Sequence, residues 1–480
     1  MSNKTLLKNF LIYGVGNMLY TLIILLLIPI YLEKFEVDDY GSFSVLYITG
    51  TLISIVFSFS ISNGILRFFH EYDNLRDRKL AITTMSLFFI GLFILTLSIL
   101  FVTPVMKGIA LYNSESSKLN FIILTTWAFG RIFINMFLGV LRADNKPVKF
   151  VVLTVIDVVI LCITNIIIIY TDKLTLTNLL NGYLFSTSLT LLISLIINKE
   201  FIGAKLNSNY LKYFMIYGIP LGFANCISYF INYGNRYFLL HYTSKIDVAV
   251  YDIAQKITGV IGVILVNGVM MAFTPYYLNL NKIETKEQFN IKINKIINTF
   301  LGVYFLFGIL IIFSDNFILD FLSKKEYMES TLYTPFLILS NVFNVLFMLL
   351  TMTTNILKKT KVELYATIVM LCVGLIANFL LIKAYGLYGA VISQMIMSIT
   401  GFIFINNYNA KFFPLDYKFQ TTFILILNFL FFVIVDKYLL GIDMNGILKI
   451  LIYLLLTILF VVVNRKYFVF AVKLIKNRLG

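Results

Sequence analysis

Charged residues are scarce in this sequence: they make up 13% of its 480 residues, whereas 59% are hydrophobic. Soluble domains carry about 25% charged residues, so this composition excludes an ordinary soluble fold. Cysteine and histidine are also rare, with three and two copies. The three cysteines all lie within apolar runs, so the sequence indicates neither a disulfide framework nor a metal site.

Signatures of catalysis are missing as well. The chain has no P-loop, no Gly-x-Ser-x-Gly motif and no zinc motif. No loop between the apolar runs is long enough to form a catalytic or nucleotide-binding domain. We therefore expect a protein that is not an enzyme and holds no cofactor and no metal. Its energy source would be an ion gradient, the membrane potential or the substrate gradient.

Long apolar runs are abundant, and about fourteen of them follow one another from Phe10 to Val463. A bilayer core takes roughly 20 apolar residues per helix, which predicts an all-α polytopic membrane protein with about fourteen transmembrane helices. Asp38–Gly50 and Asp247–Gly259 form a weak internal repeat, because both begin with Asp and end with Ile-Thr-Gly. Two six-helix lobes around a central cavity, followed by two extra C-terminal helices, would explain this repeat.

The predicted organisation has five parts. They are an N-terminal lobe (1–197), a cytoplasmic linker (198–211), a C-terminal lobe (212–407), an extra helix pair (408–463) and a basic cytoplasmic tail (464–480).

The net charge of +15 is a signal of topology. With the N-terminus in the cytoplasm, Lys and Arg gather in the cytoplasmic segments and the outer segments are slightly acidic, which is the positive-inside rule. We therefore expect a multi-pass protein of the cell (inner, cytoplasmic) membrane with both termini in the cytoplasm. Membrane lipid is an expected partner of the basic tail, and nucleic acid is not expected as a partner.

Two charged residues, Arg131 and Asp157, lie well inside predicted spans. Counted from the cytoplasmic ends of the fourth and fifth spans, both lie roughly 10–15 Å deep at a rise of 1.5 Å per residue. A charge at that depth needs a partner or a polar cavity, so a salt bridge between them is geometrically feasible. The pair either fastens the two spans together or forms a cavity site that binds an anionic group or relays charge.

Polar side chains also recur at helical spacing within predicted spans. The stripe in the seventh span consists of Asn225, Tyr229, Asn232 and Arg236. Asn17 belongs to a similar stripe in the first span, and Lys256 is one of the polar residues of the eighth. Such faces avoid lipid, either because they bind polar groups of neighbouring helices or because they line a polar cavity.

Five segments have a characteristic order and spacing. They are Tyr210–Leu240 with its Gly-Ile-Pro-Leu motif, Val248–Thr258 (VAVYDIAQKIT), Asn63–Tyr72 (NGILRFFHEY), Tyr385–Gln394 (YGLYGAVISQ) and Phe321–Leu339. Together they resemble segments of bacterial polysaccharide flippases of the O-antigen (Wzx) type. The likeness extends over nearly all of the chain up to about residue 410. One departure is Asn235, where the family often has Asp before Arg.

The resemblance implies a fold shared with multidrug exporters and lipid flippases, with two lobes that alternate between inward-open and outward-open states. It implies translocation of an undecaprenyl-pyrophosphate-linked oligosaccharide for O-antigen, lipopolysaccharide or a similar surface polysaccharide. Polysaccharide polymerase and chain-length proteins would be partners, and H⁺ or Na⁺ would be the coupling ion. A drug antiporter on the same fold and a flippase for the peptidoglycan precursor remain as alternatives.

The chemistry of such a substrate assigns expected roles to the polar residues. Arginine binds pyrophosphate through its forked donors, and Asn and Tyr hydrogen-bond to sugars. We expect Arg67, Arg131 and Arg236 to bind the pyrophosphate; Asn17, Asn225, Tyr229 and Asn232 to bind the glycan; Lys256 to line the cavity; and Asp157 to serve charge compensation or ion coupling.

Overall fold

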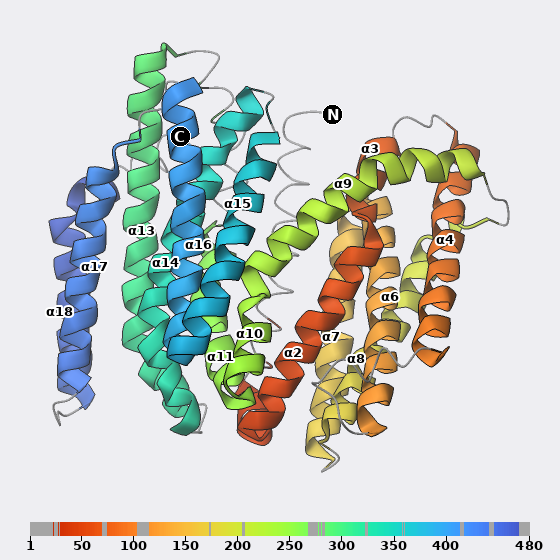
Figure 1. Cartoon of the computed structure of the whole chain (residues 1–480), viewed down its shortest axis with the longest axis horizontal. Coiled ribbons are helices and arrows are strands. Elements are labelled where there is room, and N and C mark those ends of the chain that lie inside the picture. The colour runs from red at the N-terminus through yellow and green to blue at the C-terminus, as the bar shows by residue number, and fades with distance from the viewer. Residues whose placement is uncertain are drawn as a thin grey trace. The chain divides into compact units, whose positions relative to one another are not determined.

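The structure is a computed structural model. It describes residues 29–69, 74–102, 115–171, 174–203, 207–266, 284–321, 325–357, 361–412, 417–440 and 446–469, together with Ile23, Leu27, Tyr277, Leu280 and Lys359. The described residues form helices joined by short connections, and they divide into two compact units, Met1–Phe230 and Ile231–Gly480 (Figure 1). The lobe limits expected from the sequence stay a prediction.

The first unit is built around one central helix. Its helices are α2 (Val37–Ser58), α3 (Ile61–Phe68), α4 (Leu75–Val102), α6 (Glu115–Ala143), α7 (Pro147–Tyr170), α8 (Leu176–Ile197), the short η1 (Lys199–Phe201) and most of α9 (Ser208–Tyr233). Helix α6 contacts α2, α3, α4, α7 and α8 and is the most buried span of the unit. Phe129, Ile132 and Phe137 on α6 pack with Phe89 of α4 and Phe214 of α9 in its core.

The second unit is organised around α14 in the same way. Its elements are α10 (Asn235–Tyr242), α11 (Lys245–Ile261), η2 (Gly262–Val266), α13 (Lys286–Phe321), η3 (Lys325–Glu329), α14 (Ser330–Ile356), α15 (Lys361–Ala377), η4 (Asn378–Ile382), α16 (Lys383–Phe412), α17 (Phe419–Leu440) and α18 (Gly446–Val463). Helix α14 contacts α11, α13, α15 and α16, and α17 and α18 pack on α13. The helices surrounding α14 make it the most buried of the candidate spans.

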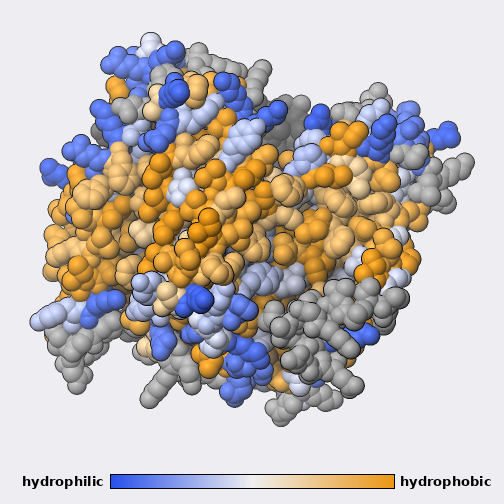
Figure 2. All heavy atoms as spheres, viewed as in Figure 1, coloured by the Kyte–Doolittle hydropathy of each residue, from blue (hydrophilic) through white to orange (hydrophobic). Residues whose placement is uncertain are grey.

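Ten helices among the described residues are long and apolar enough to cross a membrane. Hydrophobic side chains form a band along the helices, and hydrophilic side chains gather near the helix ends (Figure 2). The prediction of an all-α, multi-pass membrane protein is therefore confirmed. Most of the first predicted span and part of the eighth lie outside the described residues, so the number of fourteen spans stays a prediction.

The eleventh and twelfth predicted spans form one helical run, Lys361–Phe412, that reverses at a glycine. Gly386 has a φ of +55°, a left-handed conformation that glycine adopts without steric cost. A Cβ on Gly389 would lie 2.0 Å from the carbonyl oxygen of Leu381, so only glycine fits the inside of this turn. The turn lets α15 and α16 pack against each other.

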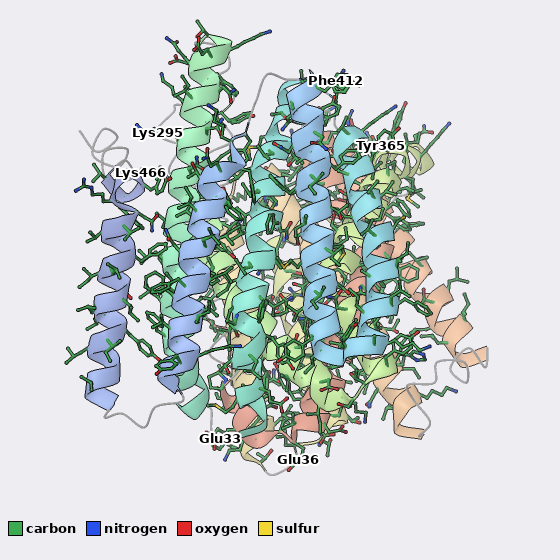
Figure 3. The ribbon with its side chains drawn as sticks, turned by 60° about the vertical axis from the view of Figure 1, so that its left-hand side comes forward. Glu33, Glu36, Lys295, Tyr365, Phe412 and Lys466 are labelled. Carbon is green, nitrogen blue, oxygen red and sulfur yellow. The ribbon has the colours of Figure 1, made fainter. Side chains whose placement is uncertain are left out.

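Four labelled side chains lie toward one end of the second unit. Lys295, Tyr365 and Phe412 come from α13, α15 and α16, and Lys466 follows α18; the sequence predicts a cytoplasmic position for all four. They lie toward the same end of the unit (Figure 3).

Helix α9 packs on a break between α2 and α3. Phe59 and Ser60 at this break have φ values of 43° and 55°, which are uncommon for residues other than glycine. A Cβ on Gly218 of α9 would lie 2.4 Å from the carbonyl oxygen of Phe59, and one on Gly222 would lie 3.1 Å from its Cα. The two glycines therefore allow the backbone of α9 to approach the break closely.

We predict that Gly218→Ala destabilises the protein, because the added methyl group must push α9 away from Phe59. Overpacking of this kind costs about 1–3 kcal/mol. Gly91→Ala is the matched control, since Gly91 is an exposed helical glycine with no atom within 4 Å of its added Cβ. Thermal unfolding of the purified proteins should show a lower Tm for Gly218→Ala alone. Equal Tm values in both variants would contradict the close approach.

Candidate functional site

Buried polar side chains gather in one cluster in each unit. In the first unit, Arg131 on α6 and Asp157 on α7 form an ion pair, which the sequence indicates as geometrically feasible. Nη1 of Arg131 donates to Oδ2 of Asp157 at 2.7 Å. The side chains are 19% and 7% exposed, so the pair is largely removed from solvent. Low exposure strengthens the attraction between the two charges and makes loss of either partner costly.

The Arg131–Asp157 pair lines a cavity of about 180 Å³ between α2, α6, α7 and α8. The residues around it are Tyr47, Thr51, Ser54, Ile55, Trp127, Arg131, Asn135, Asp157, Leu161, Tyr183, Ser186 and Thr187. Three of them form an aromatic cluster, with ring centroids 5.6 Å apart for Tyr47 and Trp127, 5.8 Å for Tyr47 and Tyr183, and 6.1 Å for Trp127 and Tyr183. The cavity therefore combines aromatic rings, hydroxyl groups and one ion pair.

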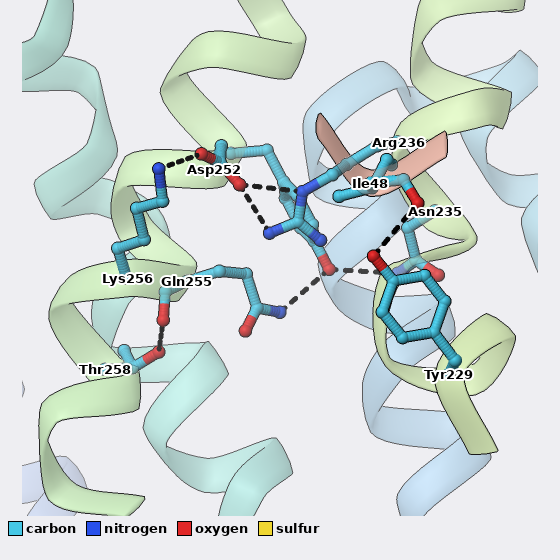
Figure 4. Close-up of polar contacts among 9 residues, drawn as sticks. Ile48, Tyr229, Asn235, Arg236, Asp252, Gln255, Lys256 and Thr258 are labelled. Atoms are coloured by element: carbon cyan, nitrogen blue, oxygen red, sulfur yellow. Dashed lines mark hydrogen bonds and ion pairs between the residues drawn. The ribbon is translucent and has the colours of Figure 1, made fainter. Parts of the chain in front are cut away.

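In the second unit, Arg236 on α10 and Lys256 on α11 share one carboxylate, that of Asp252 (Figure 4). Nε and Nη2 of Arg236 lie 2.8 and 2.7 Å from Oδ1 of Asp252, and Nζ of Lys256 lies 2.9 Å from Oδ2. The side chains of Arg236 and Asp252 are 2% and 4% exposed, whereas that of Lys256 is 35% exposed. These three side chains comprise two bases and one acid, and the most exposed of them is the lysine.

Amide groups fix the position of α10 beside this cluster. Nδ2 of Asn235 faces the oxygens of Tyr251, Ala390 and Gln394 at 2.9, 3.1 and 3.3 Å, and Nδ2 of Asn378 donates to Oδ1 of Asn235 at 3.1 Å. These bonds tie α10 to α11, η4 and α16. An Asp at position 235 could not donate to those oxygens, which gives a physical reason for Asn at this position.

Asn225 and Tyr229, which the sequence places in a polar stripe, bind neighbouring helices of the first unit. Nδ2 of Asn225 donates to Oγ of Ser60 at 3.3 Å, and the hydroxyl of Tyr229 donates to the carbonyl oxygen of Ile48 at 3.0 Å. Both contacts hold α9 against α2 and the break that follows it. They correspond to the interhelical alternative for such a stripe, and a role in glycan binding stays a prediction.

The remaining predicted residues lie apart from these contacts. Arg67 is exposed at the end of α3, with its guanidinium carbon 4.5 Å from the ring centroid of Tyr217. Asn232 is exposed near the end of α9, and α10 begins three residues later, so Arg236 belongs to a different helix from the rest of the stripe. Asn17 lies outside the described residues.

Asp252 is the main residue that the sequence does not single out. It lies near the start of the eighth predicted span, so the sequence alone suggests that its carboxylate belongs to the outer loop. Its spacing of four residues from Lys256 could have indicated the contact, because that spacing places both side chains on one face of a helix. Asp436, also buried, accepts a hydrogen bond from the hydroxyl of Tyr453 at 2.8 Å and lies just past the end of a predicted span.

The helical bundle is that of a multi-pass membrane protein, and several solved structures share its fold. A structure of lipid II flippase MurJ in an inward-closed conformation aligns with a TM-score of 0.75 and 16% identity, over 98% of this chain and 100% of that one. A Vibrio cholerae MATE transporter aligns with a TM-score of 0.57 and 16% identity, over 86% and 98% of the chains. An inward-facing multidrug resistance MATE transporter aligns with a TM-score of 0.59 and 16% identity, over 83% of this chain and 94% of that one. At these identities the likeness establishes the fold.

Family models identify the chain more closely. Residues 6–281, more than half of the chain, match the family described as polysaccharide biosynthesis protein, and residues 220–380 match the MatE family. The chain therefore belongs to the polysaccharide biosynthesis protein family, as the resemblance in its sequence predicts. No curated protein sequence matches it significantly.

We predict that Asp252→Asn destabilises the protein more than Arg236→Met or Lys256→Met. The Asn variant leaves two cations without their shared counter-charge, and one of them is fully buried. Breaking a buried pair in this way costs about 3–5 kcal/mol, whereas either Met variant leaves Asp252 with one cation. The Tm values of the purified variants in thermal unfolding measure their relative stabilities. A Tm for Asp252→Asn equal to or above that of both Met variants would show that the cluster is not organised around Asp252.

Proposed function

We propose that this protein is a flippase that moves an undecaprenyl-pyrophosphate-linked oligosaccharide from the cytoplasmic to the outer leaflet by alternating access. The oligosaccharide would be the repeat unit of O-antigen or a similar surface polysaccharide. The glycan and the pyrophosphate cannot cross hydrocarbon unaided, because each polar group without a partner there costs several kcal/mol. The polyprenyl chain can stay in lipid while the polar part passes through the protein.

The two basic side chains around one carboxylate in the Arg236–Asp252–Lys256 cluster are the observation that carries this proposal. An anionic headgroup would be attracted by the two cations, and Lys256, whose side chain is 35% exposed, is sufficiently exposed to contact it. Arg236 is buried and already bonded to Asp252. We therefore assign the phosphate contact to Lys256. Arg236 lies behind it and adds positive charge without touching the phosphate. Membership of the polysaccharide biosynthesis family supports a glycan as the polar cargo.

A drug or small-molecule antiporter is the second candidate, and the match of residues 220–380 to the MatE family favours it. Cation binding by such a protein calls for an acidic side chain inside the membrane. The three acidic side chains buried among the described residues, Asp157, Asp252 and Asp436, each contact a base or a tyrosine hydroxyl. This arrangement favours the anionic substrate. A lipid-linked peptidoglycan precursor differs in its glycan and remains a further alternative substrate.

We also propose that both termini face the cytoplasm of the inner membrane. The positive-inside pattern of the sequence supports this orientation, and so does the common end at which Lys295, Phe412 and Lys466 lie (Figure 3). In that orientation the Arg236–Asp252–Lys256 cluster belongs to the half of the second unit nearer the outer face. H⁺ or Na⁺ as coupling ion and polysaccharide polymerase and chain-length proteins as partners stay predictions.

Deletion of the gene should abolish surface polysaccharide and cause the complete lipid-linked repeat unit to accumulate on the cytoplasmic leaflet. Surface glycan assays and lipid extracts from the deletion strain measure both effects. Normal surface glycan together with sensitivity to cationic drugs would instead establish the antiporter.

In the complemented strain, Lys256→Met should lower the transport rate roughly tenfold or more, because a hydrogen bond to a charged group contributes about 1.5–3 kcal/mol. Lys245→Met is the matched control, since Lys245 lies on the same helix outside the cluster and is exposed. Export rates should be compared at equal protein levels in the membrane. Equal rates in the two variants would remove Lys256 from the proposed phosphate site.

A further inference from the structure

The cavity of the first unit has a different chemistry from the Arg236–Asp252–Lys256 cluster. Among the described residues that line it, the charged ones are Arg131 and Asp157, whose side chains lie 2.7 Å apart and compensate each other. A pyrophosphate placed there would have to give up its water without gaining a net counter-charge, and Asp157 would repel it. The cavity therefore disfavours the charged part of a lipid-linked substrate.

Neutral ligands with both polar and apolar faces suit this cavity. Trp127, Tyr47 and Tyr183 provide aromatic surface, and Thr51 and Ser186 add hydroxyl groups. A sugar ring has the same dual character, since its C–H faces are apolar and its hydroxyls form hydrogen bonds. A volume of about 180 Å³ has room for several water molecules, and so for a small polar ring.

We propose that this cavity is a binding site for one neutral sugar residue of the translocated glycan, with a ring face on the aromatic cluster and hydroxyls on Thr51 and the Arg131–Asp157 pair. The proposal rests on the proposed function. In it, a residue of the second unit contacts the phosphate, and residues of the first unit contact the sugar. Arg131 then acts as a hydrogen-bonding partner of Asp157 and the sugar, and not as a ligand of the pyrophosphate.

Trp127 gives this site its own reporter, because it is the only tryptophan of the chain. The full-length protein in nanodiscs would be titrated with two probes: the lipid-linked saccharide extracted from the deletion strain, and undecaprenyl pyrophosphate, which lacks the glycan. The saccharide-bearing lipid should shift the emission of Trp127 and protect it from acrylamide quenching. Undecaprenyl pyrophosphate should bind without protecting it.

Thr51→Val tests the contact with the sugar and preserves the shape of the side chain. It should weaken binding of the saccharide-bearing lipid about three- to tenfold, the effect of one lost hydrogen bond, and leave binding of undecaprenyl pyrophosphate unchanged. Thr96→Val is the matched control. Both hydroxyls donate to the carbonyl four residues earlier in a helix and are partly buried, but Thr96 does not line the cavity.

Each other outcome has a definite meaning. Equal protection of Trp127 by the two lipids would assign the cavity to phosphate and overturn the proposal. Binding of the saccharide-bearing lipid without any protection, or with equal affinity in Thr51→Val and Thr96→Val, would place the glycan elsewhere while leaving the flippase function intact. A deletion strain that accumulates no lipid-linked saccharide would contradict the flippase function itself.

Discussion

A lipid bilayer does not solvate charge, and this constraint governs where buried acidic and basic side chains can lie. Those that are buried among the described residues, Asp157, Arg236, Asp252 and Asp436, each bond to a partner on a neighbouring helix. Each bond crosses between two helices, so each is formed only when the bundle assembles. Charge pairing therefore fixes helix neighbours in a medium where apolar side chains gain little by leaving lipid for protein.

The same pairing gives the two units different chemical character. Arg131 and Asp157 balance each other, so the cavity beside them is neutral and polar. Asp252 is shared by Arg236 and Lys256, so two bases and one acid meet there. The proposed substrate, with a neutral glycan and an anionic pyrophosphate, would have a complementary part for each group of contacts. The balance of bases and acids in each group, more than the presence of any single arginine, is what distinguishes them.

Polar residues inside a membrane also serve to hold helices together, and α9 illustrates this use. Asn225 and Tyr229 bond to Ser60 and to the backbone of Ile48, and Gly218 allows α9 to approach the left-handed break after α2. Backbone held in that conformation costs about 1–3 kcal/mol and persists because the surrounding packing requires it. A polar stripe on a transmembrane helix can therefore form a contact between helices as well as line a binding cavity.

The sequence by itself determined the membrane class, the helical fold and the family, and it placed Arg131 and Asp157 at depths that make an ion pair feasible. Hydrophobic run length, motif order and depth along a helix are all properties of one segment or of two consecutive ones, so they can be read directly. Only the tertiary structure decided that Asp252 bridges Arg236 and Lys256, and that Tyr47, Trp127 and Tyr183 meet around a neutral cavity. Those contacts depend on which helices become neighbours and how they rotate about their axes. Neither property is encoded in the periodicity of a single helix, because packing against all of its neighbours sets both.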